Sequence, residues 1–239
     1  MSNSPFHIIH ENERFLVVDK SSGLLTIPDR MQTAKSLKEM LQEKYGSIYT
    51  VHRLDRDTSG LVIFARNEKT HQYLCSLFEN REIEKYYVGV VIGKPGASEG
   101  TIDAPMAEHP TLKGTMTVHR NGKAAVTSYQ VLEAYKPFSL VSFQLHTGRT
   151  HQIRVHAKHM GHPLAVDELY GDGKPVLLSS IKSGYKLSKQ EDEERPFINR
   201  LALHAHKVVF VDETNEKITL ESAIPKPFLA LMKQMSKWS

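Results

Sequence analysis

Hydrophobic and polar positions recur along this chain with two periods, and each period predicts one kind of element. Runs rich in β-branched and aromatic residues, bounded by glycine, proline or polar turns, predict strands. These runs cover residues 15–20, 24–28, 61–65, 86–92, 126–134, 139–145, 201–211 and 217–220. Apolar residues at helical spacing predict helices over 36–45, 67–78, 150–160 and 227–235. Asn67 and Thr150 are placed to cap two of these helices, and Gly46 is placed to end another.

The order of these elements predicts the fold class. Strands and helices mix without strict alternation, and no internal repeat or long flexible linker interrupts them. This order favours one domain of the α+β, or mixed α/β, class over residues 1–239, built in two lobes. Residues 97–122 contain only short turn-like pieces. Residues 172–198 are the most irregular part and include an acidic run at 191–194, so we expect a surface insertion there.

Composition narrows the class of protein only a little. The net charge is +4 with 13 histidines, and the pI is near 9. This mild basicity permits a polyanionic partner without requiring one. The single cysteine, Cys75, excludes an intrachain disulfide and favours a reducing compartment. No signal peptide follows Met1, and no apolar run reaches the roughly 20 residues of a membrane span. We therefore expect a cytoplasmic protein without a membrane partner.

The first candidate site is Asp55, in a polar segment that directly precedes the predicted strand 61–65. A carboxylate between Arg53 and Arg56, at the mouth of a core strand, is held in place and left accessible. Asp55 and Asp57 also have the spacing of a phosphatase pair, but in that arrangement the apolar strand comes first. The alternative for Asp57 is a salt-bridged turn.

The second candidate site is the segment 146–156, which contains three histidines and two arginines. On a helix, His151 and Arg154 lie three residues apart on one face, so Arg154 can point inward toward a carboxylate. Arg149, near the helix start, is well placed for phosphate oxygens. Earlier in the chain, Tyr86 and Tyr87 start a strand and face opposite sides. One of them packs in the core, and the other can stack on a nucleobase.

Other chemistries find less support in the sequence. His156, His159 and His162 drift around a helix axis, and neither a cysteine nor a clear acidic ligand accompanies them, so core or solvated histidines are the default and no metal is expected. A serine hydrolase would need a Gly-x-Ser-x-Gly turn, and the chain has none. Cys75 lies on the apolar face of a predicted helix and is expected to be a buried small residue.

Taken together, these segments resemble the RluA-type family of RNA pseudouridine synthases. The resemblance runs from about residue 14 to 228 and rests mainly on two long signatures, 52–61 and 147–156. Shorter matches support it, namely Lys85-x-Tyr87, Gly161-His162-Pro163-Leu164, Leu169-Tyr170-Gly171, Leu203-His204-Ala205 and Ala223-x-Pro225. The resemblance implies a pseudouridine synthase fold, with a central mixed, largely antiparallel sheet in two lobes flanked by helices and loops.

The resemblance also implies an activity and roles for single residues. The enzyme would convert uridine to pseudouridine in ribosomal or transfer RNA, acting as a monomer without cofactor, metal or DNA. Asp55 matches the catalytic aspartate, Arg154 the arginine that pairs with it, and Tyr87 the tyrosine that stacks on the target base and assists proton transfer from C5. Leu203 matches a pocket residue. Arg53 matches the arginine that fills the gap left by a flipped nucleotide; we expect Arg56, Arg149 and His151 to bind RNA as well.

Four departures from the family pattern stand out. Lys20-Ser21 replaces a Lys-Pro pair, which is expected to loosen a turn without touching a catalytic role. Val166-Asp167 replaces a Gly-Asp pair. The 172–198 segment is longer than in relatives, and the small N-terminal RNA-binding domain of many relatives is expected to be absent. The competing hypothesis is a catalytically idle RNA-binding protein on the same fold.

Overall fold

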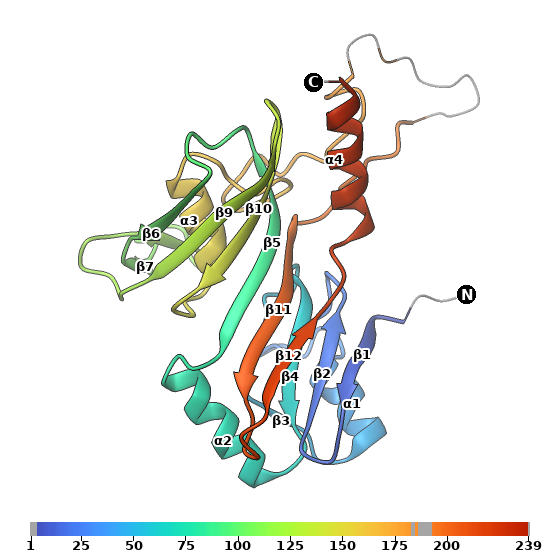
Figure 1. Ribbon diagram of the computed structural model, residues 1–239, viewed down its shortest axis with the longest axis vertical. Coiled ribbons are helices and arrows are strands. Elements are labelled where there is room, and N and C mark those ends of the chain that lie inside the picture. The colour runs from blue at the N-terminus through green and yellow to red at the C-terminus, as the bar shows by residue number, and fades with distance from the viewer. Residues whose placement is uncertain (1–3, 183–184, 186–192, 239) are drawn as a thin grey trace. The chain divides into compact units, whose positions relative to one another are not determined.

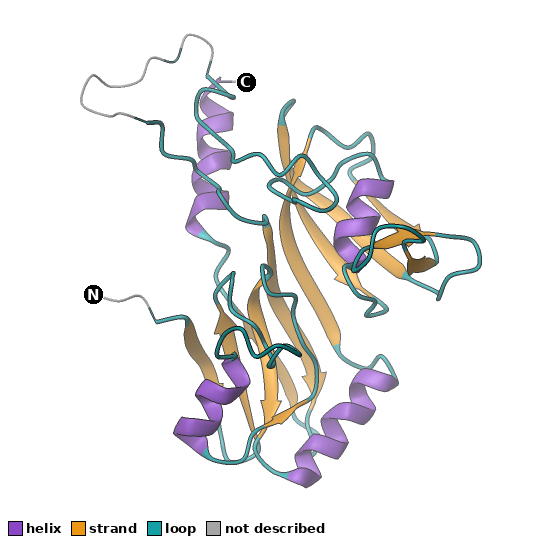
Figure 2. Cartoon of the chain, turned by 180° about the vertical axis from the view of Figure 1, so that it is seen from behind, coloured by secondary structure: helices purple, strands orange, loops and turns teal. Residues whose placement is uncertain are grey.

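The protein is described by a computed structural model over residues 4–182, 185 and 193–238. The chain divides into two compact units. The first comprises Met1–Tyr87 and His204–Ala223, and the second comprises Val88–Leu203 and Ile224–Ser239. Helices and strands are mixed in both, which confirms the predicted α+β class (Figures 1 and 2). No helix within the described residues is long and apolar enough to cross a membrane.

The first unit contains a mixed sheet. Its strands are β1 (Phe6–Glu11), β2 (Phe15–Lys20), β3 (Tyr49–Thr50), β4 (Ser59–Ala65), β11 (Leu203–Val211, from His204 on) and β12 (Lys217–Glu221). The order is β1-β2-β4-β11, with β12 beside β11 and β3 beside β4 (Figure 1). β4 and β11 run parallel, and the other pairs are antiparallel. The sheet is therefore mixed and largely antiparallel, as expected.

Two helices accompany this sheet. α1 (Leu37–Tyr45) starts at Ser36, whose side chain and that of Glu39 form a reciprocal capping box. α2 (Glu68–Glu79) starts at the predicted cap Asn67, whose side chain accepts the Thr70 N–H, and it packs beside β3 and β4 (Figure 2). Alternate residues of the strands meet α2 in one apolar cluster, whose buried members are Phe15, Val17, Leu61, Ile63, Ala65, Leu74, Leu77, Ile83, Val208 and Phe210.

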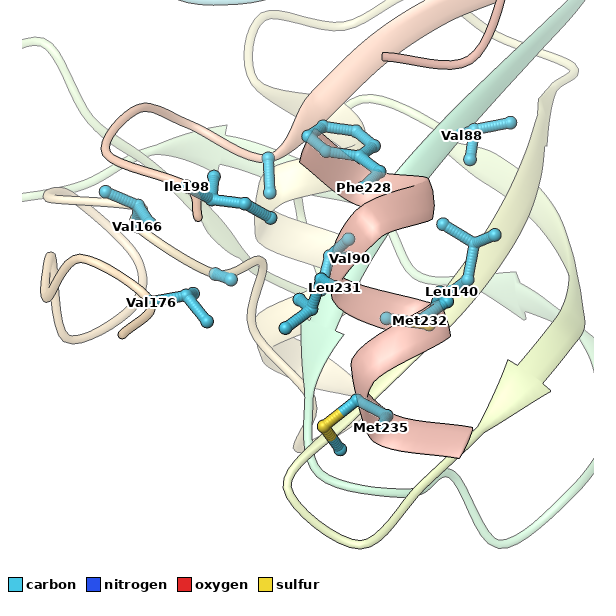
Figure 3. Packing of buried hydrophobic residues seen from close by; sticks show 12 residues of the cluster. Val88, Val90, Leu140, Val166, Val176, Ile198, Phe228, Leu231, Met232 and Met235 are labelled. Carbon is cyan, nitrogen blue, oxygen red and sulfur yellow. The ribbon is translucent and has the colours of Figure 1, made fainter. Parts of the chain in front are cut away.

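The second unit is built on antiparallel strands and two helices. Its elements are β5 (Glu84–Ile92, from Val88 on), β6 (Glu99–Asp103), β7 (Met106–Glu108), β8 (Met116–Val118), β9 (Val126–Ala134), β10 (Phe138–Leu145), α3 (Gln152–His159) and α4 (Lys226–Trp238). β5, β10, β9 and β6 lie side by side in that order, and β7 pairs with β8. Figure 3 shows Phe228, Leu231, Met232 and Met235 of α4 packing against Val88, Val90 and Leu140.

Three predictions about local structure were wrong. Residues 24–28 form no strand, because the Leu25 and Thr26 carbonyls accept the N–H groups of Leu37 and Lys38 at the start of α1. Residues 97–122 contain β6, β7 and β8 rather than turns alone. α3 starts after His151, in the left-handed conformation with φ 56°, and not after a Thr150 cap.

The predicted 172–198 insertion lies partly outside the described residues. Its two described ends enter the core of the second unit. Val176 and Ile198 pair through the Val176 N–H and the Ile198 carbonyl at 2.8 Å, and both side chains are buried beside α4 (Figure 3). The ends of this segment therefore belong to the packed structure of the unit.

Candidate active site

The backbone of the Asp55 loop is held by a buried lysine. The side chain of Lys20 is fully buried, and its ammonium donates to the carbonyls of Ser21, Leu24 and Arg56 at 3.1, 2.7 and 2.8 Å. An ammonium has three protons, so these three acceptors match its donors in number. Burying such a charge is costly unless it is hydrogen-bonded. Lys20 therefore ties two segments, residues 21–24 and the Asp55 loop, to the end of β2.

Two hydroxyl groups extend the same arrangement. The Thr26 hydroxyl donates to the Leu54 carbonyl at 2.9 Å and accepts the Leu54 N–H at 3.2 Å. The Ser22 hydroxyl donates to the Asp57 carbonyl at 2.6 Å. These contacts fix the main chain on either side of Asp55.

His52 anchors the loop at its start. Its ring stacks on Phe78, with centroids 4.6 Å apart, and its Nε2 accepts the Ile63 N–H at 2.9 Å. Nε2 therefore carries no proton, and the ring is neutral. Burial, and then the charge of Lys85, lower the pKa of His52 to about 3. Lys85 itself lies 5.7 Å from the Phe78 ring, and burial lowers its pKa as well.

Tyr87 is close enough to Asp55 to respond to its charge. The tyrosine is only 9% exposed. Burial first, and the Asp55 carboxylate second, raise the pKa of Tyr87 far above its ordinary value. At neutral pH its hydroxyl is therefore protonated, and it can donate a hydrogen bond. Its neighbour Tyr86 is half-buried and donates to Glu84 at 2.7 Å, so Tyr87 is the one of the pair that lies near the carboxylate.

The arginines that flank Asp55 are exposed. Arg53 lies on the surface of the loop. Arg56 is also exposed and pairs with Asp57 at 3.2 Å. Asp57 thus forms the salt-bridged turn that the sequence offered as the alternative to a phosphatase pair. Asp55, Tyr87, Arg53 and Arg56 all belong to the first unit.

In the second unit, Arg154 forms a buried, two-pronged ion pair with Asp167. Its Nε and Nη2 donate to the two carboxylate oxygens at 2.8 Å each, with side-chain exposures of 8% and 0%. Asp167 also accepts the N–H groups of Leu169 and Tyr170 at 3.0 Å. The carboxylate that Arg154 meets within its own unit is therefore that of Asp167, and its pairing with Asp55 stays a prediction. This pair uses one edge of the guanidinium, which has five donors in all.

The neighbours of Arg154 fix its direction further. Its guanidinium lies 5.0 Å from the Tyr170 ring, a cation–π arrangement. The Tyr170 hydroxyl accepts the Met116 N–H at 2.8 Å and contacts Nδ1 of His151 at 2.7 Å. Arg149, partly exposed, donates from Nε to the Ala124 carbonyl at 3.1 Å. Leu203, at the boundary of the unit, is 4% exposed.

The rest of the second signature is scaffold. The Gln152 side chain accepts the Thr147 hydroxyl and the Arg149 N–H at 2.8 and 2.9 Å. Its amide donates to the Val126 carbonyl at 3.0 Å and to the Thr127 hydroxyl at 2.9 Å. All four hydrogen-bonding positions of the amide are therefore used. This locks the start of α3 onto β9 and so sets the direction in which the helix presents Arg154.

His156 belongs to the same scaffold. Its Nδ1 lies 2.9 Å from the Thr127 hydroxyl and its Nε2 lies 3.0 Å from the Ala104 carbonyl. Burial lowers its pKa, so it is a neutral core histidine. Within the described residues, no group of three histidine, cysteine or acidic side chains could hold a metal ion. Burial also raises the pKa of Cys75, which disfavours a reactive thiolate.

Sequence reasoning missed two residues of this site. In the sequence Lys20 stands out only for the serine that follows it, and no local pattern shows that its ammonium will meet a carbonyl 36 residues away. Asp167 stands out in the sequence only because Val166-Asp167 replaces the Gly-Asp pair of the family. The usual Gly-Asp pair was the available signal, since Val166 has a positive φ of 57°, the conformation that glycine adopts most easily.

Comparisons with known proteins identify the family of this chain. A family model described as RNA pseudouridylate synthase matches residues 14–159. The chain is 34% identical to the uncharacterized RNA pseudouridine synthase YjbO of Bacillus subtilis, over 96% of this chain and 76% of the relative. It is 36% identical to the ribosomal large subunit pseudouridine synthase D of Haemophilus ducreyi, over 98% of this chain and 71% of the relative.

A solved structure shares the fold. The human RNA pseudouridylate synthase domain containing 1 superposes with a TM-score of 0.72 at 29% identity, covering 95% of this chain and 86% of that one. An α+β fold with both signature segments, matched over most of its length, places this chain in the RNA pseudouridine synthase family. It is an isomerase that acts on uridine in RNA.

Proposed function

We propose that this enzyme isomerises specific uridines of ribosomal RNA, with Asp55 as its catalytic residue, acting on a nucleotide flipped out of the RNA stack. The observation that carries the assignment of Asp55 is its environment. Its loop backbone is fixed by Lys20, and its carboxylate lies near the buried phenol of Tyr87. The name of a relative 36% identical to this chain, a ribosomal large subunit enzyme, favours ribosomal over transfer RNA.

The reaction cuts the bond between uracil N1 and the ribose, turns the base, and rejoins it through C5. Asp55 acts on the ribose or the base while this happens, as nucleophile or base. Atoms balance without a co-reactant, because the proton lost from C5 is matched by the one gained at N1. Neither N1 nor C5 can be reached inside a base stack, so the nucleotide must leave it at a cost of a few kcal/mol.

The other side chains offset that cost or aim the reacting groups. Tyr87 is the stacking platform, and its raised pKa makes it a hydrogen-bond donor in the free enzyme. A protonated phenol is a poor base, so its part in removing the C5 proton would have to come late, when charge has moved from Asp55. The exposed Arg53 fills the vacated stack, while Arg56, Arg149 and His151 bind phosphate oxygens.

Two further roles complete the proposal. Arg154 pairs with Asp55, and Leu203 lines the uracil pocket. The support for Arg154 is its rigidity. Asp167 grips one edge of the guanidinium, and Tyr170 lies against it. A cation held in this way can aim a carboxylate without itself moving. The enzyme is proposed to work as a cytoplasmic monomer on RNA alone.

The test compares two neighbouring aspartates. Asp55→Asn should lower pseudouridine formation at least about 10³-fold while leaving RNA affinity unchanged, because an amide can neither attack nor accept a proton. Asp57→Asn, which loses only an exposed ion pair with Arg56, should stay within about twofold of the parent. The substrate is total RNA from a deletion strain, with pseudouridines mapped before and after treatment.

Each outcome of this test decides something. A restored site in ribosomal RNA supports the substrate class, and a site restored only in transfer RNA overturns it. Full activity of Asp55→Asn contradicts the proposed mechanism. A parent protein that binds the RNA but restores no site would instead be the idle RNA-binding protein considered from the sequence.

A further inference from the structure

A chain of hydrogen bonds crosses the sheet of the first unit beside the Asp55 loop. The Ser59 hydroxyl lies 2.9 Å from Nδ1 of His204, and Nε2 of His204 lies 3.2 Å from the Ser222 hydroxyl. The Ser222 hydroxyl donates to Oδ2 of Asp19 at 2.8 Å. Ser59, His204 and Ser222 are 4%, 2% and 1% exposed. The chain therefore runs through protein interior and joins β2, β4, β11 and the residue that follows β12.

The last bond gives the chain a direction. A hydroxyl has one proton, and Ser222 uses it on Asp19, so Ser222 can only accept from His204. His204 must then carry a proton on Nε2. In its neutral form the other ring nitrogen is bare and accepts the proton of the Ser59 hydroxyl. The chain then runs one way, from Ser59 through His204 and Ser222 to the carboxylate of Asp19.

The register shows that this polar chain interrupts an apolar face. Asp19 follows Phe15 and Val17 at every second position of β2, and Ser59 precedes Leu61 and Ile63 in β4. His204, directly opposite Ser59, likewise precedes Val208 and Phe210 on β11. On this face the polar residues Ser59, His204 and Asp19, with the partly buried His206 next along β11, gather toward the end where the Asp55 loop enters β4. Buried polar groups are costly unless paired, so apolar residues would be the simpler choice there.

Three of the residues joined by these hydrogen bonds are neighbours in sequence of functional residues. Asp19 precedes Lys20, which binds the Asp55 loop, and Ser59 directly follows that loop. His204 directly follows Leu203, the proposed pocket residue. Gly60 allows the backbones of β4 and β11 to lie in direct contact. A Cβ at this position would fall 2.2 Å from the Ala205 carbonyl oxygen. A shift of His204 would therefore be passed directly to the end of the loop.

We propose that Ser59, His204, Ser222 and Asp19 form a positioning network for the isomerisation, which fixes the exit of the Asp55 loop and the start of β11. None of the four touches substrate. A Ser–His–Asp nucleophile is excluded for this set, because Ser59 is buried and Ser222 stands between the imidazole and the carboxylate. The proposal rests on the proposed function, since its effect is on the rate of that reaction.

The main test removes the central link. Ser222→Ala should lower the single-turnover rate at saturating enzyme about tenfold, while the enzyme concentration that gives half the maximal rate changes less than twofold. The matched control is Ser139→Ala, which also removes a buried hydroxyl, bonded to the Gly93 carbonyl at 2.8 Å, but in the second unit. It should lose similar thermal stability and keep its rate. The probe is total RNA from a deletion strain.

A second pair covers the possibility that Ser222→Ala folds poorly. Asp19 is only partly buried, so both of its variants should fold. Asp19→Asn keeps an acceptor for Ser222 and should retain nearly the full rate, whereas Asp19→Ala should behave as Ser222→Ala. Nitrogen NMR of the parent protein should show His204 protonated at Nε2. A proton on Nδ1 alone would overturn the direction of the chain.

The outcomes separate the two proposals. If the parent restores no pseudouridine, the proposed function fails and the positioning role fails with it. If the parent is active but Ser222→Ala and Ser139→Ala have equal rates, the network is only structural and this proposal alone is overturned. If Ser222→Ala changes only the enzyme concentration that gives half the maximal rate, the positioning proposal is also overturned, because the network would then act on RNA binding.

Discussion

Between His52 and Ser59, the Asp55 loop is held by means opposite to those that hold the α3 segment. In the Asp55 loop, side chains from outside the loop bind its backbone carbonyls, as Lys20 does at Arg56 and Thr26 does at Leu54. In the segment around α3, the signature side chains themselves make the contacts, as Gln152 does with four partners and Arg154 does with Asp167.

This difference explains which side chains each segment can offer to a substrate. A loop held by its carbonyls keeps its own side chains outside the restraint, so Arg53 and Arg56 can stay exposed on either side of Asp55. A segment held by its side chains is rigid but has few of them left to bind substrate. We therefore expect the loop to carry the chemistry and the α3 segment to carry the precision with which Arg154 is aimed.

The largest effect is expected from the ion pair of the second unit. Asp167→Asn removes the charge that compensates a buried guanidinium, and should lower the free energy of unfolding by about 3 kcal/mol. Urea denaturation measures this loss. Asp172→Asn is the control, because Asp172 is exposed and caps only the Lys174 N–H. Equal stabilities of the two variants would contradict the claim that side-chain pairing holds this segment.

The corresponding change in the first unit is Lys20→Met. It leaves three carbonyls without the ammonium that they share and should cost about 2–3 kcal/mol. Hydrogen exchange should also speed up at the N–H groups of Gly23 and Thr58, which bond to the Arg56 and Asp55 carbonyls. Lys35→Met, at an exposed ion pair with Glu43, is the control. If the loop amides stay protected in Lys20→Met, the loop is not held by its carbonyls.

A smaller effect is expected from pH, through His52. Its pKa is about 3 in the folded protein and near 6.5 when unfolded, so the unfolded chain binds the extra proton between these values. Stability is complete above pH 6.5 and falls as the pH is lowered, by about 1–2 kcal/mol at pH 5. His52→Gln keeps an acceptor for the Ile63 N–H but does not titrate. Its stability should therefore fall less steeply than that of the parent over this range, and parallel curves would refute a neutral His52.

The smallest effect is expected at Val166. Its φ of 57° is strained for a β-branched residue by about 1–2 kcal/mol, and its buried side chain contributes a similar amount to the core. Val166→Gly should therefore change the free energy of unfolding by less than about 1 kcal/mol. Ala165→Gly, next to it in the same cluster, should lose about 1 kcal/mol. A loss of 3 kcal/mol or more in Val166→Gly would mean that the positive φ costs nothing.

The elements that could be predicted from the sequence are those with local signals. Asn67 caps α2 as expected, because a capping contact spans only three residues. The apolar run 61–65 became the fully buried β4. The pattern does not predict β1, because every second residue of this strand faces solvent. Two of the six residues of β1 are also histidines. Thr150 is not the cap, because α3 starts one residue later, after a left-handed His151 whose side chain makes no capping hydrogen bond.

The site divides along the same line. The position of Asp55 was visible, because a polar loop before a buried strand is a local pattern. Lys20 was not, since its partners lie up to 36 residues away and depend on how β2 meets the loop. Asp167 was partly predictable, because a local signal existed beside it. The residue before it departs from glycine, and only the backbone conformation of Val166 shows why glycine is usual there.

The division of the chain into units has a consequence for its synthesis on the ribosome. Each unit is completed by residues near the C-terminus, the first by His204–Ala223 and the second by Ile224–Ser239. The bond from Ser59 to His204 spans 145 residues, and α4 supplies Phe228, Leu231 and Met232 to the core of the second unit. Neither unit can finish its core before residues from 204 onward are made, so in a nascent chain neither should gain full protease resistance before that point.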